Sequence, residues 1–180
     1  NFYAPTAYWI TSIFALLTIP STTSVQLSFL LSMICAFFGM QYFLGQFFRT
    51  RHDDWSSWIG ASAYVTSTYF ATEVMVRGNL SESWFLALLP LALGLITHNS
   101  RSQLTSLQIL TTIILSLLFT THNMMLLFAI PIVIIYVCFF PKKKTNLLCV
   151  FLALIIDSYF LIPAFWEGSL IQAATISKEY

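Results

Sequence analysis

The sequence predicts an all-α fold, a polytopic transmembrane helical bundle with about seven spans. Charged residues make up only 8% of the 180 residues, whereas an ordinary soluble domain has about 25%. Hydrophobic residues make up 58%, and the mean hydropathy is +0.80. Because a folded domain needs polar groups wherever it meets water, this composition excludes a soluble globular protein. The apolar runs are long and do not alternate with polar residues, which favours helices over barrel strands.

Charged and turn-forming residues divide the chain into apolar runs, and the first three lie before Arg77. The first run, 3–19, is short and aromatic and ends at Pro20. The second, 25–48, is long enough to cross with some tilt and stops at the charged stretch 49–54. The third, 58–76, has Glu73 near its end and stops before Arg77. We expect each of these runs to form one span.

Four further runs complete the predicted membrane domain, which covers residues 1–180 as a single unit. The fourth, 81–96, contains Pro90, where a kink is expected. The fifth, 104–119, ends at a short polar break, and the sixth, 124–140, is followed by a proline and three lysines. The seventh, 147–163, ends at a proline, and the polar tail after it is expected to leave the membrane.

Composition also excludes other classes of protein. The low charge and high apolar content exclude disorder, and a net charge of only +1 excludes a nucleic-acid-binding protein. Cys35, Cys138 and Cys149 lie inside apolar runs without metal-ligand spacing, so we interpret them as buried hydrophobic residues. The chain begins at Asn1 and its first methionine is Met33, so we expect a fragment of a larger protein.

The positive charges fall into two groups of connections, because successive spans alternate between the two sides of a membrane. One group holds Arg49, Arg51, Arg101, Lys142, Lys143 and Lys144, and the other holds Arg77 and Lys178. Short cytoplasmic loops are rich in Lys and Arg, so we expect the larger group in the cytoplasm. With this orientation, the polar residues that are not explained as ordinary loop residues all fall on the outer face. They are Glu73, Arg77, Glu82, His122, Asn123 and Glu167. A site at the outer membrane boundary is predicted.

The segment from Glu73 to Glu82 predicts a tight outer hairpin. Glu73 and Arg77 are spaced i,i+4 at a helix end, and Gly78 suits the left-handed position after that helix. Asn79 is expected to cap the next helix, with Glu82 at its third position. The hairpin does not require an arginine, and a guanidinium beside a helix N-terminus is suited to holding a phosphate. Pure hairpin structure and anion binding both stay open.

His122 and Asn123 open the sixth run at the same predicted face. A histidine there can act as a base, a proton carrier or a hydrogen-bond donor to an anion. The alternative is that Thr120, Thr121 and Asn123 cap the helix and His122 has no further role. His98 falls on the predicted cytoplasmic side, and we interpret it as part of a loop.

Two acidic residues are further candidates for a catalytic role. Asp157 lies within the seventh run, where a lipid-facing carboxylate would cost roughly 2.5 to 3.5 kcal/mol, so it should face the bundle. We expect Arg77 or His122 as its partner, in either a functional or a structural ion pair. Glu167 lies on the predicted outer tail, where it is either catalytic or simply solvated. No cofactor is predicted; a divalent metal stays open as an alternative, although no residue pattern in this sequence supports one.

Four short motifs now give the chain a recognisable outline. They are the outer turn Val-Arg-Gly-x-Leu-x-Glu, then Leu-Leu-Pro-Leu at 88–91, then Thr-His-Asn, and finally Leu-Ile-Pro-Ala. Over roughly residues 60–170 the chain resembles the bacterial integral-membrane family labelled "6-pyruvoyl-tetrahydropterin synthase-related". That family is similar to the GT-C class of polytopic glycosyltransferases. Pterin chemistry is not implied, because the soluble synthase needs a zinc-binding histidine cluster that this sequence lacks.

The resemblance implies a GT-C-like glycosyltransferase of a bacterial plasma membrane that acts on a polyprenyl-phosphate-linked sugar at the outer face. Its partners would be membrane lipid and that sugar donor. The residues expected to bind substrate or phosphate are Arg77, Gly78, Glu82 and Asn123, and those expected to be catalytic are His122, Asp157 and Glu167. In this class the catalytic base lies in the large outer loop after the first span, and this sequence shows no such loop, so either the base lies upstream of Asn1 or this member is not a transferase.

Two alternatives use the same residues. In a transporter or lipid flippase, Asp157, Arg77 and His122 would form a polar pathway through the bundle. In a non-catalytic membrane module, the outer face would bind a polyprenyl lipid or a partner protein.

Overall fold

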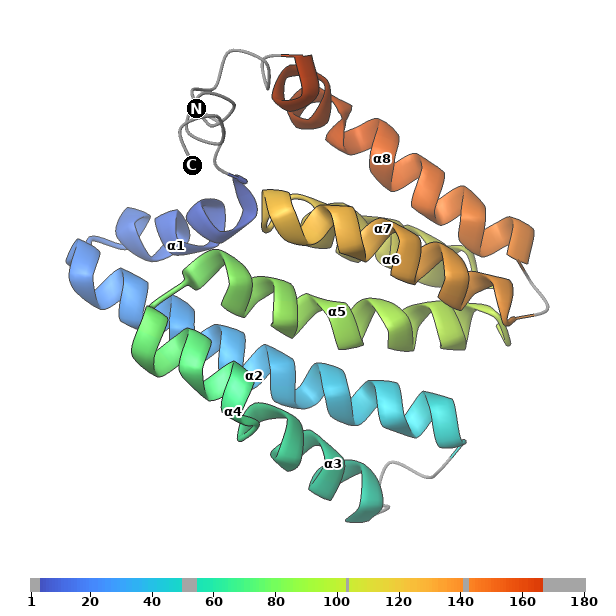
Figure 1. Ribbon diagram of the computed structural model, residues 1–180, viewed down its shortest axis with the longest axis horizontal. Helices are drawn as coiled ribbons and strands as arrows, with labels where there is room; N and C mark the ends of the chain where they lie inside the picture. The colour runs from blue at the N-terminus through green and yellow to red at the C-terminus, as the bar shows by residue number, and fades with distance from the viewer. Residues whose placement is uncertain (1–3, 50–54, 103, 141–142, 167–180) are drawn as a thin grey trace, which may run out of the picture.

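A computed structural model describes residues 4–49, 55–102, 104–140 and 143–166, and its regular elements within these ranges are all helices. They are α1 (Thr6–Leu16), α2 (Ser21–Phe48), α3 (Trp55–Val65), α4 (Thr68–Ala71), the π-helix η1 (Thr72–Arg77), α5 (Leu80–Asn99), α6 (Thr105–Phe119), α7 (Asn123–Cys138) and α8 (Lys143–Trp166). The helices pack side by side as a bundle (Figure 1). The predicted all-α fold is confirmed for these ranges.

Three helices in the described ranges are long and apolar enough to cross a membrane: α2, α5 and the segment Lys143–Pro163 of α8. The remaining apolar helices are shorter, and α7, with 16 residues, extends for only about 24 Å at 1.5 Å per residue. The hydrocarbon core of a bilayer is about 30 Å thick. The structure therefore supports three crossings by length, and the full number of seven stays a prediction.

The third predicted run does not form one continuous helix. It is divided into α3, α4 and η1, with a break at Thr66 and Ser67. Ser67 adopts an extended backbone, with φ −58° and ψ 144°, and its side chain accepts a hydrogen bond from Phe70 N at 3.4 Å. A serine in this conformation starts a new helix by capping it, which explains why the helix restarts here.

Small side chains on α2 allow the central pair of helices, α2 and α5, to pack closely. The buried positions of α2 recur every three or four residues and include Ser24, Ser28, Ser32, Ala36 and Gly39. Trp84 of α5 reaches across this face and donates from Nε1 to Ser28 Oγ at 3.0 Å. In a lipid bilayer the hydrophobic effect does not drive helices together, so they associate through close packing of small residues and through interhelical hydrogen bonds. The α2–α5 pair is the centre of the bundle (Figure 1).

Gly94 of α5 tests how tightly this pair is packed. A Cβ atom added there would lie 2.7 Å from Tyr42 Cδ1 and 3.1 Å from Phe43 Cα, both on α2. Since the backbone of α2 cannot move aside without disturbing the whole interface, Gly94→Ala is expected to lower the free energy of unfolding by about 1–2 kcal/mol. Unfolding of the chain in detergent micelles, followed by circular dichroism, measures this change.

Gly45 provides the matched control, because it is a buried glycine within α2 whose added Cβ would meet no atom within 4 Å. Alanine is a better helix former than glycine by up to about 1 kcal/mol, so Gly45→Ala should leave stability unchanged or raise it. Equal losses in the two variants would contradict the close packing of α2 against α5.

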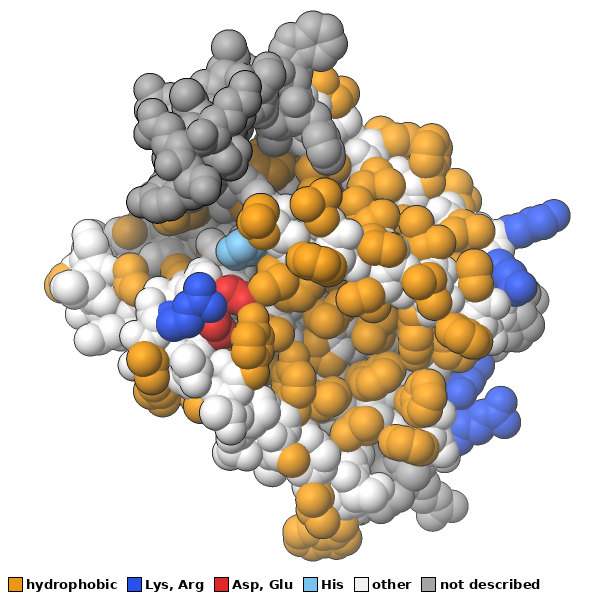
Figure 2. Space-filling model, in the orientation of Figure 1, with side chains coloured by type: hydrophobic (Ala, Val, Ile, Leu, Met, Phe, Trp, Pro, Cys, Tyr) orange, Lys and Arg blue, Asp and Glu red, His pale blue; other side chains and the backbone are white. Residues whose placement is uncertain are grey.

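The two ends of the bundle differ in charge. One end, the basic end, carries Arg49 after α2, Arg101 after α5, and Lys143 and Lys144 at the start of α8. Arg101 donates from Nη1 to the carbonyl oxygen of Gln46, which ties the ends of α5 and α2 together. The opposite end, the Arg77 end, holds η1 and the N-termini of α5 and α7 (Figure 1). Hydrophobic side chains cover much of the visible surface between the two ends (Figure 2).

Candidate functional site

An arginine and two buried glutamates form the core of the cluster at the Arg77 end. Arg77 Nη1 donates to Glu73 Oε1 at 2.6 Å and lies 3.6 Å from Glu82 Oε2. The side chains of Glu73 and Glu82 are only 2% and 3% exposed, whereas that of Arg77 is 56% exposed. The hydrogen bond to Glu73 and the charge of Glu73 raise the pKa of Arg77. A charged guanidinium is thus held at the surface by carboxylates beneath it.

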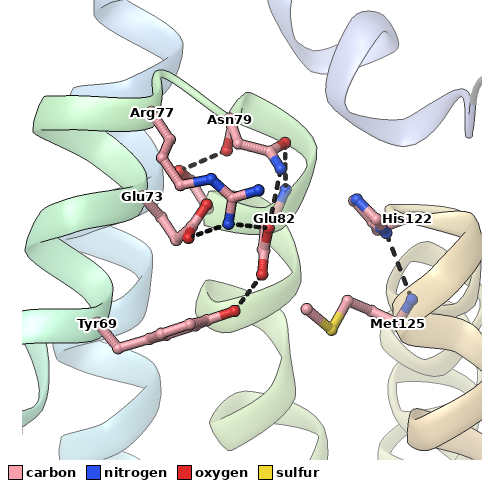
Figure 3. A network of polar contacts seen from close by, with 8 residues as sticks. Tyr69, Glu73, Arg77, Asn79, Glu82, His122 and Met125 are labelled. Carbon is pink, nitrogen blue, oxygen red and sulfur yellow. Dashed lines mark hydrogen bonds and ion pairs between the residues drawn. The ribbon is translucent and has the colours of Figure 1, made fainter.

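Two neutral side chains hold Glu82 in place. Tyr69 donates its hydroxyl hydrogen to Glu82 Oε1, and Asn79 donates from Nδ2 to Glu82 Oε2 at 2.8 Å. Figure 3 shows these residues converging from α4, η1 and the start of α5. Because both carboxylate oxygens accept a hydrogen bond, Glu82 is satisfied as a carboxylate even without Arg77.

The backbone between the two glutamates follows the predicted hairpin. Gly78 has φ +60° and ψ 31°, the left-handed conformation that glycine adopts without steric cost. Asn79 caps α5, since its side chain accepts a hydrogen bond from Glu82 N at 3.3 Å. Asn79 N in turn donates to Glu73 O at 3.1 Å, across the end of η1. The i,i+4 pair of Glu73 and Arg77, the Gly78 position and the Asn79 cap are confirmed, although the helix before them is a π-helix.

His122 lies at the first residue before α7 and caps that helix with its ring. Its Nδ1 accepts a hydrogen bond from Met125 N at 3.3 Å. A nitrogen that accepts cannot carry the proton, so in the neutral ring the proton is on Nε2, which is then a donor. In Figure 3 the imidazole lies on the side of α7 that faces the Arg77 cluster. The cap of α7 is therefore His122 itself, not Thr120 or Thr121 as the alternative interpretation had it.

One carboxylate oxygen in the cluster has no partner. Glu73 Oε2 is buried without a hydrogen bond among the described residues. Both ion pairs of Arg77 use the same nitrogen, Nη1. With Glu73, Glu82 and Arg77 ionised, the three groups carry a net charge of −1. The cluster therefore combines an exposed guanidinium with one buried carboxylate that is only half satisfied.

Asp157 does not have the partner that the sequence suggested. It is 1% exposed and faces the bundle as expected, but it accepts a hydrogen bond from Ser116 Oγ rather than pairing with Arg77 or His122. The reason is packing: Asp157 lies on the face of α8 that contacts α6, while Arg77 precedes α5. Its Oδ2 atom is buried without a partner in the described ranges. Asp157 is thus separate from the Arg77 cluster.

The other predicted site residues are placed as follows. Gly78 and Glu82 lie with Arg77 in the cluster, and Asn123 is the exposed first residue of α7, next to His122. Glu167 lies outside the described residues. Within the described ranges, no three His, Cys, Asp or Glu side chains come together as potential metal ligands. Four of the predicted site residues therefore lie with His122 at the Arg77 end of the bundle: Arg77, Gly78, Glu82 and Asn123.

His98 was wrongly interpreted as a loop residue. It lies in the last turn of α5, where its Nδ1 shares a hydrogen bond with Tyr42 OH at 2.7 Å. Sequence reasoning also missed the buried pair beside it, in which Asn99 Nδ2 donates to Asn146 Oδ1 at 2.7 Å. The sequence signal for this pair was the position of Asn99 and Asn146 next to apolar runs, because an amide that is buried there needs a hydrogen-bond partner.

The chain has no significant match among protein-family models, curated proteins or solved structures. Its class is consequently defined by the fold and the site alone. It is a helical bundle in which three helices have membrane-crossing length, with a charged cluster at the end opposite its basic side chains.

Proposed function

We propose that this chain belongs to a polytopic membrane protein, a GT-C-like glycosyltransferase, that acts on a polyprenyl-phosphate-linked sugar. The Arg77 end is the outer face in this proposal, and the basic end is cytoplasmic, because cytoplasmic loops are enriched in Lys and Arg. Figure 2 illustrates the underlying asymmetry: basic side chains gather at one end, and a basic side chain beside acidic groups and a histidine lies at the other.

The observation that carries the proposal is the exposed guanidinium of Arg77 at the same end of the bundle as the imidazole of His122 (Figure 3). The guanidinium offers several N–H donors in a fixed plane, and Nε2 of His122 offers one more. Both lie near helix N-termini, those of α5 and α7, whose free amides favour negative charge. Donors that converge on one surface region at the membrane boundary suit the phosphate of a lipid whose tail stays in the bilayer.

In the proposed reaction, an acceptor hydroxyl attacks the sugar carbon, and the bond from that carbon to the phosphate oxygen breaks. Arg77 neutralises the charge that develops on the departing lipid phosphate, and His122 Nε2 donates a hydrogen bond to the phosphate or the acceptor. The proton of the acceptor passes to a carboxylate that acts as the general base. Asp157 takes no part in this step, because it contacts Ser116 and not the cluster.

The test of this proposal is binding of a short prenyl phosphodiester, citronellyl phosphoglucose, to the chain in lipid nanodiscs. We expect the wild-type chain to bind it and to bind citronellyl glucoside, which has the same chain and sugar but no phosphate, far more weakly. His122→Asn keeps an acceptor for the cap of α7, but its shorter side chain has no donor at the position of Nε2, so it should weaken phosphodiester binding about tenfold.

Isothermal titration measures both affinities, and circular dichroism checks that the variant retains its helices. Equal affinity for the phosphodiester and the glucoside would contradict phosphate recognition. An unchanged affinity in His122→Asn would remove His122 from the site.

A further inference from the structure

A groove with a volume of about 370 Å³ lies between α6 and α8, in the half of the bundle that leads to the basic end. Its lining residues on α8 include Leu148, Leu152 and Ile156, which are four residues apart and therefore share one face of the helix. Ile109 and Ile113 line it from α6. This α6–α8 groove extends for about 12 Å along α8, at 1.5 Å per residue, and has the volume of a small-molecule site.

Two lining residues of the groove carry polar atoms that the protein itself already satisfies. Thr112 donates from Oγ1 to the carbonyl oxygen of Gln108 at 3.0 Å, and Cys149 donates from Sγ to the same oxygen at 3.6 Å. Because both donors are used inside the protein, neither requires a polar partner from an occupant of the groove. The groove between the isoleucine and leucine side chains therefore suits a hydrocarbon chain.

The part of the groove nearest the basic end has unused hydrogen-bond donors. Thr105, the first residue of α6, and Gln108, three residues later, both line the groove and lie on one face of the helix. Within the described ranges, neither the hydroxyl of Thr105 nor the side-chain amide of Gln108 has a hydrogen-bond partner. Leu104, the residue before α6, provides no side-chain cap, so the first amides of the helix are also free of a capping side chain.

A positive charge lies at the same end of the groove. Lys144 is exposed and precedes Leu148 by four residues, so it lies one turn before the groove and on the side of α8 that lines it. Side chains on a helix lean toward its N-terminus, which here directs the ammonium group to the membrane surface. The first three turns of α6 and of α8 contain no acidic residue that would neutralise this charge. The end of the groove is therefore suited to an anionic group.

We propose that the α6–α8 groove binds one anionic phospholipid, with an acyl chain along the groove and the phosphate at Thr105, Gln108 and Lys144. A phospholipid joins a charged phosphate to a long hydrocarbon chain, and the groove offers donors and a positive charge at the basic end and apolar side chains deeper in the bundle. Basic pockets between membrane helices hold anionic lipid headgroups in the same way. No residue of the Arg77 cluster lines the groove, so this inference does not rest on the function proposed above.

The experiment titrates the chain in detergent micelles with phosphatidylglycerol, which is anionic, or with phosphatidylcholine that has the same acyl chains but no net charge. Native mass spectrometry counts the bound lipids and gives the affinity of the first. We expect the first phosphatidylglycerol to bind about tenfold more tightly than the first phosphatidylcholine, because its headgroup adds no positive charge beside Lys144. Equal affinities for the two lipids would overturn the inference.

Lys144→Gln tests the headgroup end of the groove, since it removes the charge and keeps a polar side chain. We expect it to weaken phosphatidylglycerol binding about fivefold and to leave phosphatidylcholine binding unchanged. Arg49→Gln is the matched control, because it removes one positive charge from the same end of the bundle but follows α2, which does not line the groove. Equal losses in the two variants would show attraction by net charge alone and would contradict a specific site.

Ile113→Trp tests the acyl-chain end, because a larger side chain there fills the groove. Ile113 is 47% exposed, so the helix packing can remain intact, which circular dichroism checks. We expect both lipids to bind about tenfold more weakly, whereas Ile135→Trp, at a 58% exposed position of α7 outside the groove, should bind them as the wild-type chain does. Unchanged binding in Ile113→Trp would overturn the inference. A dimer that only Ile113→Trp separates would assign the groove to a second copy of the chain instead.

Discussion

Arg77→Ala is expected to weaken phosphodiester binding about a hundredfold, the largest effect on binding that we predict. The guanidinium is the only positively charged group among the described residues at the Arg77 end, and hydrogen bonds between charged groups are the strong ones. Isothermal titration of the chain in nanodiscs with dibutyl phosphate measures the loss. Arg77→Lys keeps the positive charge but loses the planar guanidinium with its paired N–H donors. Its affinity should therefore lie between those of the wild-type chain and Arg77→Ala.

Arg101→Ala is the matched control, since Arg101 follows α5 just as Arg77 precedes it. It lies at the basic end, where its positive side chain would attract an anionic lipid by charge alone, outside the groove between α6 and α8. Phosphodiester affinity should be unchanged in this variant. A larger loss in Arg101→Ala than in Arg77→Ala would place the binding site at the basic end.

Asn146→Ala is expected to lower the free energy of unfolding by about 3 kcal/mol, the largest stability effect that we predict. Asn146 is 0% exposed and connects three groups of α5 to α8. It accepts from Asn99 Nδ2 at 2.7 Å and donates to Ser100 Oγ at 2.7 Å and to Ile96 O at 3.3 Å. Alanine would leave these buried groups without partners and would also leave a cavity.

Thr145→Ala, one residue earlier and only partly buried, should change stability by less than about 0.5 kcal/mol. Chemical unfolding of both variants in detergent micelles gives the comparison. If the two variants lost stability equally, Asn146 would not be the link between α5 and α8.

The segment from Glu73 to Glu82 could be predicted from the sequence because its contacts join residues only three or four positions apart. Glu73 and Arg77 are four residues apart, and Asn79 and Glu82 are three apart, so helix periodicity and capping rules predict them. Gly78 is predicted for the same reason, since a left-handed residue after a helix is usually glycine. The π-helical turn before it is not predicted, because an i,i+4 pattern does not distinguish α from π.

The contacts that sequence reasoning missed join residues from separate helices. Asn99 and Asn146 are 47 positions apart, and Ser116 and Asp157 are 41 apart. Which helix faces which is decided by packing, here by the small residues on α2 and the contact of α6 with α8. Composition predicts that a buried Asp or Asn needs a partner, but only the arrangement of helices identifies it.

A structure of the chain with bound citronellyl phosphoglucose tests the phosphate site most directly, since it locates the phosphate. The phosphate is expected within 3.2 Å or so of the Arg77 guanidinium and of Nε2 of His122, with the ring still capping α7 through Nδ1. A phosphate bound at the basic end, among Arg101, Lys143 and Lys144, with the Arg77 cluster unchanged, would contradict the proposed site.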